Sequence, residues 1–379
     1  MNRKAVKDGK YQLFSKGANV DTLKSACIEK LKQWVLDSKK YRDNFCKEKI
    51  FHPSSFWKKM NIFLKYIFDL SPENLENIRA HIGMGYFIGG PWYEDFFNGA
   101  TILSDQDAEL KSKLIEKYNK YTQGIPKNYM ASEPRTNSEV SMIGINYKNK
   151  LINGDIVKEQ ACIANLYNLG LIGNSDKPMV IMEIGSGYGQ LVWQLSQAQP
   201  NSTFIIVDYP ETLFWSGTFL AINSKNESVH MWKEGDDIDR LINDVNCKFI
   251  LIPNFAIQQL GSHKFVDLIV NQNSFQEMSD GQIQFYAAYL SSILKGYIYS
   301  YNAKKQFMNK DLKSTVSKLL NTKFKGSITS GVSGNRAVNF EKKYIYLGFS
   351  SHLKDPPARR FGASNKVWLS DNSIDFNNE

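Results

Sequence analysis

Short apolar runs alternate with segments of helical periodicity through the middle of the chain. In the helical segments apolar residues recur every three or four positions, as at Leu191, Val192 and Leu195. The apolar runs have the length of buried strands and lie at residues 179–184, 204–207, 249–252, 265–270 and 297–301, with a shorter one at 229–232. Strands that alternate with helices build a parallel sheet covered on both faces, so we expect an α/β, doubly wound, Rossmann-like fold.

Helical periodicity dominates the first part of the chain. Apolar residues recur at helical spacing, with polar residues between them, in residues 20–36, 56–67 and 105–121. We therefore predict a helical N-terminal region at residues 1–150, with a role in acceptor binding or oligomerisation. The Rossmann-like domain is predicted at residues 151–379, and its first helix, 156–169, is predicted to be capped by Asp155.

Two segments in the N-terminal region lack a regular pattern. Residues 122–150 are polar, and we interpret them as a linker or as a cover over the active site. Residues 81–97, HIGMGYFIGGPWYEDFF, combine four glycines with an aromatic cluster. Turn formation and aromatic packing explain this segment without a ligand. The alternative is that it lines an acceptor pocket, with Trp92 or Tyr93 stacked on the acceptor and His81 nearby.

The C-terminal part is predicted to close the sheet. Residues 311–320 show helical periodicity, and residues 343–349 form an apolar strand. Its partner is predicted at Ile328 or at residues 337–340, which gives an antiparallel hairpin at the end of the sheet.

Composition excludes several classes of protein. The chain has 379 residues, of which 42% are hydrophobic, and it contains no apolar run long enough for a transmembrane helix and no recognisable signal peptide. Its four cysteines are far apart, which argues against a disulfide framework and a zinc site, so we expect a cytoplasmic protein. The net charge of +9 is explained by a solvated surface, and the alternatives are an anionic acceptor such as a nucleotide-linked sugar, or contact with nucleic acid or an anionic membrane. Because no compact Arg/Lys cluster is interleaved with aromatics, we do not expect nucleic-acid binding.

Candidate chemistry is concentrated in residues 177–211, KPMVIMEIGSGYGQLVWQLSQAQPNSTFIIVDYPE. The pattern predicts a strand, a glycine turn, a helix and a second strand that ends at Asp208. Glycines allow a backbone to bend sharply and to lie close to a ligand, and the helix that follows offers free N–H groups. Asp208, at the carboxyl end of the second strand, is placed to accept hydrogen bonds from ribose hydroxyls.

The spacing of the glycines distinguishes two cofactor classes. A dinucleotide site requires G-x-G-x-x-G, but Gln190 occupies the place of its third glycine. The chain instead has E-x-G-x-G-x-G, with Glu183 two residues before the first glycine. A carboxylate there suits a ligand that carries an ammonium and a sulfonium. The pattern therefore favours S-adenosylmethionine over NAD, and the alternative is an α/β fold that binds nothing at this turn.

The run EIGSGYGQL…IIVDYPETL…FILIPN…VDLIVNQNSFQEM resembles the sugar O-methyltransferases, a bacterial branch of the class I S-adenosylmethionine-dependent methyltransferases with a helical N-terminal region. The resemblance covers about residues 150 to 310. It implies that residues 271–278 form the floor between cofactor and acceptor. Tyr209 departs from the leucine expected after Asp208. The cofactor-binding residues that we predict are Glu183, Gly185, Gly187, Gly189, Asp208, Tyr209, Asn254 and Asn271.

The resemblance implies methyl transfer to a sugar hydroxyl, in the synthesis of a surface glycan such as capsule or lipopolysaccharide. A hydroxyl is a poor nucleophile, so a general base is expected. Glu277 is the first candidate because it follows a strand end at the ligand edge, although it equally suits a helix start. His81 is the second candidate, if the N-terminal region folds over the cofactor. His263 precedes a strand, on the opposite edge, and no residue pair has metal-ligand spacing, so we expect no metal.

Other functions remain open on the sequence. The same fold can serve a small metabolite, a nucleic acid or a protein as acceptor, although the chain lacks the N-P-P-Y type motif of enzymes that methylate exocyclic amines. A methyltransferase-like partner subunit without activity is a second alternative, and a nicotinamide enzyme, disfavoured by Gln190, is a third. The sequence does not identify the sugar or its hydroxyl, and it leaves a homo-oligomer open.

Overall fold

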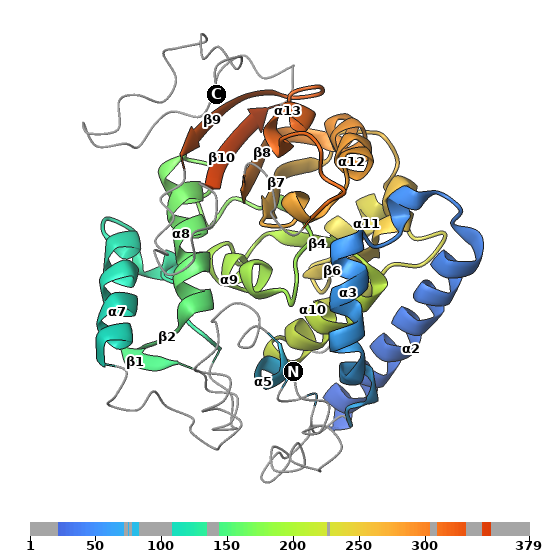
Figure 1. The fold of residues 1–379 in the computed structure, drawn as a ribbon. Helices are drawn as coiled ribbons and strands as arrows, with labels where there is room; N and C mark the ends of the chain where they lie inside the picture. The colour runs from blue at the N-terminus through green and yellow to red at the C-terminus, as the bar shows by residue number, and fades with distance from the viewer. Residues whose placement is uncertain are drawn as a thin grey trace.

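The structure is a computed structural model, and it describes residues 22–71, 75, 78–82, 108–134, 144–225, 228–303, 309–330 and 343–349. In these residues a sheet of eight strands forms the centre of the molecule (Figure 1). Its spatial order is β5-β6-β4-β3-β7-β8-β10-β9. The bounds are β3 Val180–Ile184, β4 Thr203–Asp208, β5 Val229–Met231, β6 Phe249–Pro253, β7 Val266–Gln272, β8 Leu294–Ala303, β9 Lys325–Ser330 and β10 Lys343–Phe349.

The sheet has the doubly wound topology that the sequence predicts. The strands from β5 through β8 in the spatial order are all parallel, and β10 is antiparallel to both β8 and β9. From the central strand β3 the chain first builds β4, β5 and β6 on one side, and it then crosses to β7 and β8 on the other. The strand order therefore reverses between β3 and β7, and ligands of open α/β sheets bind at the carboxyl ends of the strands at such a point.

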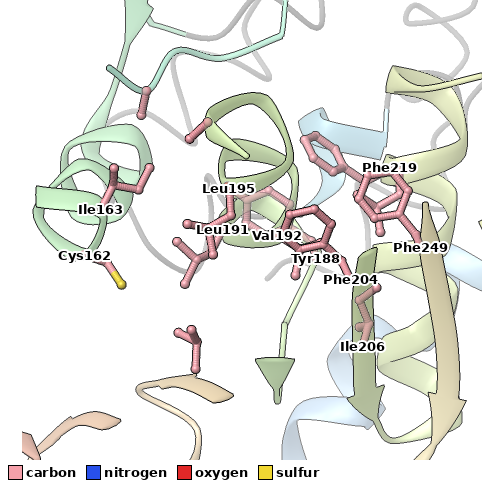
Figure 2. Close-up of a cluster of buried hydrophobic side chains, with 14 of the residues drawn as sticks. Cys162, Ile163, Tyr188, Leu191, Val192, Leu195, Phe204, Ile206, Phe219 and Phe249 are labelled. Atoms are coloured by element: carbon pink, nitrogen blue, oxygen red, sulfur yellow. The ribbon is translucent and has the colours of Figure 1, made fainter. Parts of the chain in front are cut away.

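Alternate strand residues enter two separate hydrophobic cores, one on each face of the sheet. Ile181 belongs to one core and Met182 to the other, as the period-two geometry of a strand requires. Figure 2 shows part of the first core, where Cys162 and Ile163 of α8 lie near Leu191 and Val192. Helices α8 Gly154–Asn168, α9 Gln190–Ala198 and α10 Pro210–Asn223 cover that face, and α11 Ile238–Ile242, α12 Asp280–Ile293, α13 Val316–Leu320 and the 3-10 turns η9 Asn254–Leu260 and η10 Phe275–Glu277 belong to the other.

The described N-terminal helices pack into the same core as the sheet. Ile28 and Leu31 lie in one cluster with Phe214, and α2 runs beside α10 (Figure 1). At Gly217 of α10 an added Cβ would lie 2.7 Å from Leu31, so a glycine permits this close approach. The N-terminal helices are α2 Thr22–Phe45, α3 Ser55–Leu64, α5 Ile78–His81 and α7 Ala108–Thr122, with 3-10 turns η2 Lys49–Phe51, η3 Lys65–Asp69 and η6 Lys127–Tyr129. None of the described helices is long and apolar enough to cross a membrane. A domain boundary at residue 150 stays a prediction.

Several local predictions are wrong. Residues 122–150, which show no regular pattern in the sequence, include β1 Ile145–Tyr147, and β1 forms an antiparallel hairpin with β2 Lys150–Ile152 that is too short to leave a periodic signal. Asn153, and not Asp155, caps α8, because its side chain accepts the Ile156 N–H. The helix predicted at 311–320 begins only after Thr315, which caps it.

A buried ion pair joins α2 to the start of α10. The two Arg42 amino nitrogens, Nη1 and Nη2, each donate to one carboxylate oxygen of Glu211 at 2.8 Å. Both side chains are buried, so neither charge has water as an alternative partner. Removing one member of such a pair leaves the other charge buried and uncompensated. The resulting loss in the free energy of unfolding is larger than the loss when both members are replaced by apolar residues.

We expect Arg42→Ala to lower the free energy of unfolding by about 3 kcal/mol, because Glu211 stays buried without its partner. Denaturant unfolding followed by circular dichroism measures this change. Lys39→Ala, which removes the exposed ion pair with Asp43 on the same helix, is the matched control and should cost less than about 1 kcal/mol. Equal losses in the two variants would contradict the expectation.

Candidate functional site

The turn between β3 and α9 contains three glycines in left-handed conformations. The φ angles are 73° at Gly185, 59° at Gly187 and 86° at Gly189. An added Cβ at Gly185 would collide with Ser274, and one at Gly189 would lie 3.2 Å from Ser216. At Gly187 the same Cβ would meet nothing within 4 Å. Two glycines therefore serve packing, and the middle one exposes backbone to open space that a ligand can enter.

Asp208, at the end of β4, lies directly beside this turn. One carboxylate oxygen accepts the Gly187 N–H at 3.3 Å, and the other accepts the Tyr209 N–H at 2.7 Å. Burial raises the pKa of Asp208 to about 7, although these backbone N–H groups act in the opposite direction. The predicted ribose acceptor and the predicted glycine turn are thus in direct contact.

Glu183 is the second carboxylate next to the turn, on β3. It is 3% exposed, and within the described residues its Oε2 has no hydrogen-bond partner. Burial raises its pKa well above the usual value, and the negative charge of Glu159 raises it further. Lys158 and the backbone N–H of Val192, in the first turn of α9, lower it. A buried carboxylate with an unused oxygen indicates a position that a donor or a cation can complete.

The other predicted cofactor residues lie at the same edge of the sheet. Asn271, on β7, donates to the Ile184 carbonyl at 2.8 Å and accepts from Asn302 at 2.7 Å, so it locks the switch point between β3 and β7. Asn254 donates to the Phe51 carbonyl at 3.0 Å, and its own Oδ1 has no partner among the described residues.

Tyr209 contacts the segment around η2 through its hydroxyl group. Its hydroxyl donates to the His52 carbonyl at 3.4 Å and accepts from the Gln282 side chain at 2.9 Å. Gln282, on α12, also donates to the carbonyls of Ile50 and His52 at 3.0 Å. The segment around η2 is therefore fastened across the carboxyl edge of the sheet.

Of the two candidate bases, the side chain of Glu277 lies within the described residues and that of His81 does not. Glu277 lies in η10, and one of its carboxylate oxygens accepts the Trp57 indole N–H at 3.0 Å. Ser54 donates to its backbone carbonyl at 2.7 Å, so α3 is anchored beside it. His81 is the last residue of α5, and its side chain lies outside the described residues, as do Trp92 and Tyr93. His263 bonds Asp239 at 2.9 Å and precedes β7, away from the carboxyl edge.

A buried charged cluster next to the turn escaped the sequence analysis. Arg79, on α5, donates to Glu133 and to Asp155, each at 2.7 Å. Tyr188, between the second and third glycines, donates to the same Asp155 oxygen at 3.1 Å. The sequence does carry a signal, because Asp155 and Glu159 lie four residues apart on the buried face of α8, where most side chains are apolar. Charges on such a face indicate a buried network.

Metal ligation finds no support in the described part of the chain. There, no three residues among His, Cys, Asp and Glu are grouped so that they could hold a metal ion.

No protein-family model and no curated protein sequence matches the chain. Among solved structures, magnesium protoporphyrin IX methyltransferase from Synechocystis PCC 6803, with bound S-adenosylmethionine, is 12% identical; the alignment covers 66% of this chain and 99% of that one, with a TM-score of 0.35. Precorrin-6y C5,15-methyltransferase from Geobacter metallireducens GS-15 is 15% identical; the alignment covers 55% of this chain and 94% of that one, with a TM-score of 0.31. An S-adenosylmethionine-dependent methyltransferase from Aquifex aeolicus is 13% identical; the alignment covers 49% of this chain and 87% of that one, with a TM-score of 0.30.

The raised pKa of Asp208 predicts a specific pH dependence of stability. Between pH 4 and 7 the folded state holds the proton that the unfolded state has lost, so the contribution of Asp208 falls as the pH rises through this range. The difference in unfolding free energy between the wild type and Asp208→Asn should change by up to about 4 kcal/mol across it. Denaturant unfolding of both proteins at a series of pH values measures this difference, and a pH-independent difference would contradict the assignment.

Proposed function

We propose that the chain is an S-adenosylmethionine-dependent O-methyltransferase that methylates a sugar hydroxyl. The observation that carries the proposal is a pair of buried acidic side chains beside the glycine turn: Glu183, at the end of β3, and Asp208, which accepts the Gly187 N–H. The cofactor supplies a methyl group on a sulfonium. We propose that Asp208 holds its ribose hydroxyls, that Gly187 allows its close approach, and that Glu183 faces its cationic amino-acid part.

The charges at the turn favour this cofactor over a dinucleotide. A pyrophosphate is anionic, and Glu183 and Asp208 offer it no positive charge beside the turn and repel it where they are ionised. Asp208 already accepts the Gly187 N–H, one of the backbone groups of this turn that a phosphate would need. Gln190 takes the place of the third dinucleotide glycine and begins α9 with a buried side chain. Asn254 and Tyr209, at the next strand ends, are proposed to border the adenosine part.

The acceptor is proposed from the resemblance of residues 150–310 to sugar O-methyltransferases and from Glu277. In the proposal Glu277 takes the proton from the acceptor hydroxyl, because its carboxylate lies just beyond β7 at the ligand edge. The indole N–H of Trp57 donates to one carboxylate oxygen and so orients the side chain. His81 is the alternative base. We propose a sugar, nucleotide sugar or glycan as the acceptor, with a role in the synthesis of a surface glycan in the cytoplasm.

Gly187→Ala should abolish measurable binding of S-adenosylhomocysteine and leave the fold intact. The methyl group has room in the protein but enters the space proposed for the cofactor, and the left-handed conformation costs about 1 to 2 kcal/mol. Calorimetric titration measures the binding, with NAD as the contrasting ligand. Gly124→Ala is the matched control. Gly124 has the same left-handed conformation and open space around it, but it lies on the connection between α7 and η6, so this variant should bind S-adenosylhomocysteine as the wild type does. Wild-type binding of NAD alone, or of neither ligand, would refute the cofactor.

Glu277→Gln should reduce methyl transfer to a sugar acceptor by at least about 100-fold, with unchanged affinity for S-adenosylhomocysteine. Gln keeps the shape and an acceptor for the Trp57 N–H, so the change removes only the basic group. Transfer of a radiolabelled methyl group to a panel of monosaccharides and nucleotide sugars measures the activity. A wild type that binds the cofactor and methylates no member of the panel would refute the sugar acceptor. A variant as active as the wild type would exclude Glu277 as the base.

A further inference from the structure

A second buried glutamate lies on α8, on the same side of the sheet as the glycine turn. Glu159 is 2% exposed, and its Oε2 has no hydrogen-bond partner among the described residues. The side chain of Gln272, at the end of β7, donates to the neighbouring carbonyl of Lys158 at 3.5 Å. This contact holds one turn of α8 against the carboxyl end of the strand next to β3. Glu159 is therefore fixed near the point where the strand order reverses.

The local charges do not balance. Lys158 reaches one oxygen of Glu159 at 2.8 Å, but its side chain is 29% exposed and therefore partly in water. Arg79, the other nearby cation, is already engaged by Glu133 and Asp155. Glu183, also with an unused oxygen, adds a further carboxyl to the same interior. Acid groups thus outnumber the cations that face them.

Structural roles do not account for Glu159. Glu183 interacts with the first turn of α9, where an anion is favourable, so it has a partial explanation without a ligand. Glu159 lies in the middle of α8 and caps nothing. A buried carboxyl in mid-helix that keeps an oxygen unused costs stability, which suggests that a ligand completes its bonding.

We propose that Glu159, together with Glu183, binds the α-ammonium group of the cofactor's amino-acid part. This inference rests on the proposed function and adds a binding residue from α8 to it. An ammonium group has three N–H donors and a positive charge, so it satisfies the unused oxygens and balances the acid groups at once. Asp208, on the β4 side of the turn, is left for the neutral ribose hydroxyls.

Binding of an ammonium group is linked to the ionisation of this pair. Burial raises the pKa of both glutamates, and Glu159 raises that of Glu183, so the pair keeps its protons to higher pH than exposed glutamates do. The positive charges of Lys158 and Arg79 lower the pKa of Glu159, and the negative charge of Asp155 raises it. The negative charge of Asp208 raises the pKa of Glu183. When the ammonium binds, its charge favours the ionised carboxylates, so binding lowers the pKa of the pair. Affinity should therefore increase with pH while the pair still holds its proton.

Two ligands that differ in the amino-acid part test the inference. S-adenosylhomocysteine carries the ammonium, and 5′-methylthioadenosine has the same adenosine and thioether without it. Glu159→Gln should weaken the first at least about tenfold and leave the second unchanged. Glu116→Gln, at an exposed position of α7, is the matched control and should change neither. Equal weakening of both ligands, or no weakening, would overturn the inference.

The wild type alone provides a second test, which does not depend on the folding of a variant. Calorimetry at a series of pH values should show that the affinity for S-adenosylhomocysteine, relative to that for 5′-methylthioadenosine, rises with pH as the pair loses its protons. A ratio of the two affinities that does not change with pH would overturn the ammonium site and leave the proposed cofactor intact. Failure of both ligands to bind the wild type would instead refute the proposed function.

Discussion

Burial of carboxylates beside a glycine turn is the constraint on which the arrangement of this protein depends. Parallel strands need helices on both faces, so the ends of β3 and β4 are removed from water together with Glu183 and Asp208. Burial makes the charged forms costly, and the protein offsets that cost with backbone N–H groups at Gly187 and Tyr209. The offset is incomplete at Glu183, where one oxygen remains unused. Such incomplete bonding is characteristic of sites that a ligand completes.

The N-terminal helices contribute to this site as well as to the core. Arg42 fastens α2 to the start of α10, directly after Asp208 and Tyr209. The η2 segment is tied to the carboxyl edge through bonds from Asn254 to Phe51 and from Gln282 to His52. These bonds join parts of the chain that are some two hundred residues apart. The site is therefore assembled from both ends of the described chain, around a turn that is local in sequence.

Charge and hydrogen bonding act differently on the two sides of the turn. On the β4 side, Asp208 is held by backbone donors and has a fixed orientation. On the α8 side, carboxyl groups share few cations, and Tyr188 connects the turn to Asp155 and through it to Arg79. One side is thus suited to neutral hydroxyls and the other to a cation. This polarity matches the two ends of the proposed cofactor.

The sequence by itself determined the alternation of strands and helices, the glycine turn, and the positions of Glu183 and Asp208 at strand ends. These features are local: a strand shows as an apolar run, a helix as a period near 3.6, and a left-handed turn as glycine. Only the tertiary structure decided that Asn153 caps α8, that Trp57 bonds Glu277, and that Arg79 joins Glu133 to Asp155. Pairs such as Trp57 and Glu277 lie far apart in sequence, and no periodicity encodes which distant side chains meet. They meet because burial leaves each polar group only the partners that the packed elements bring within reach.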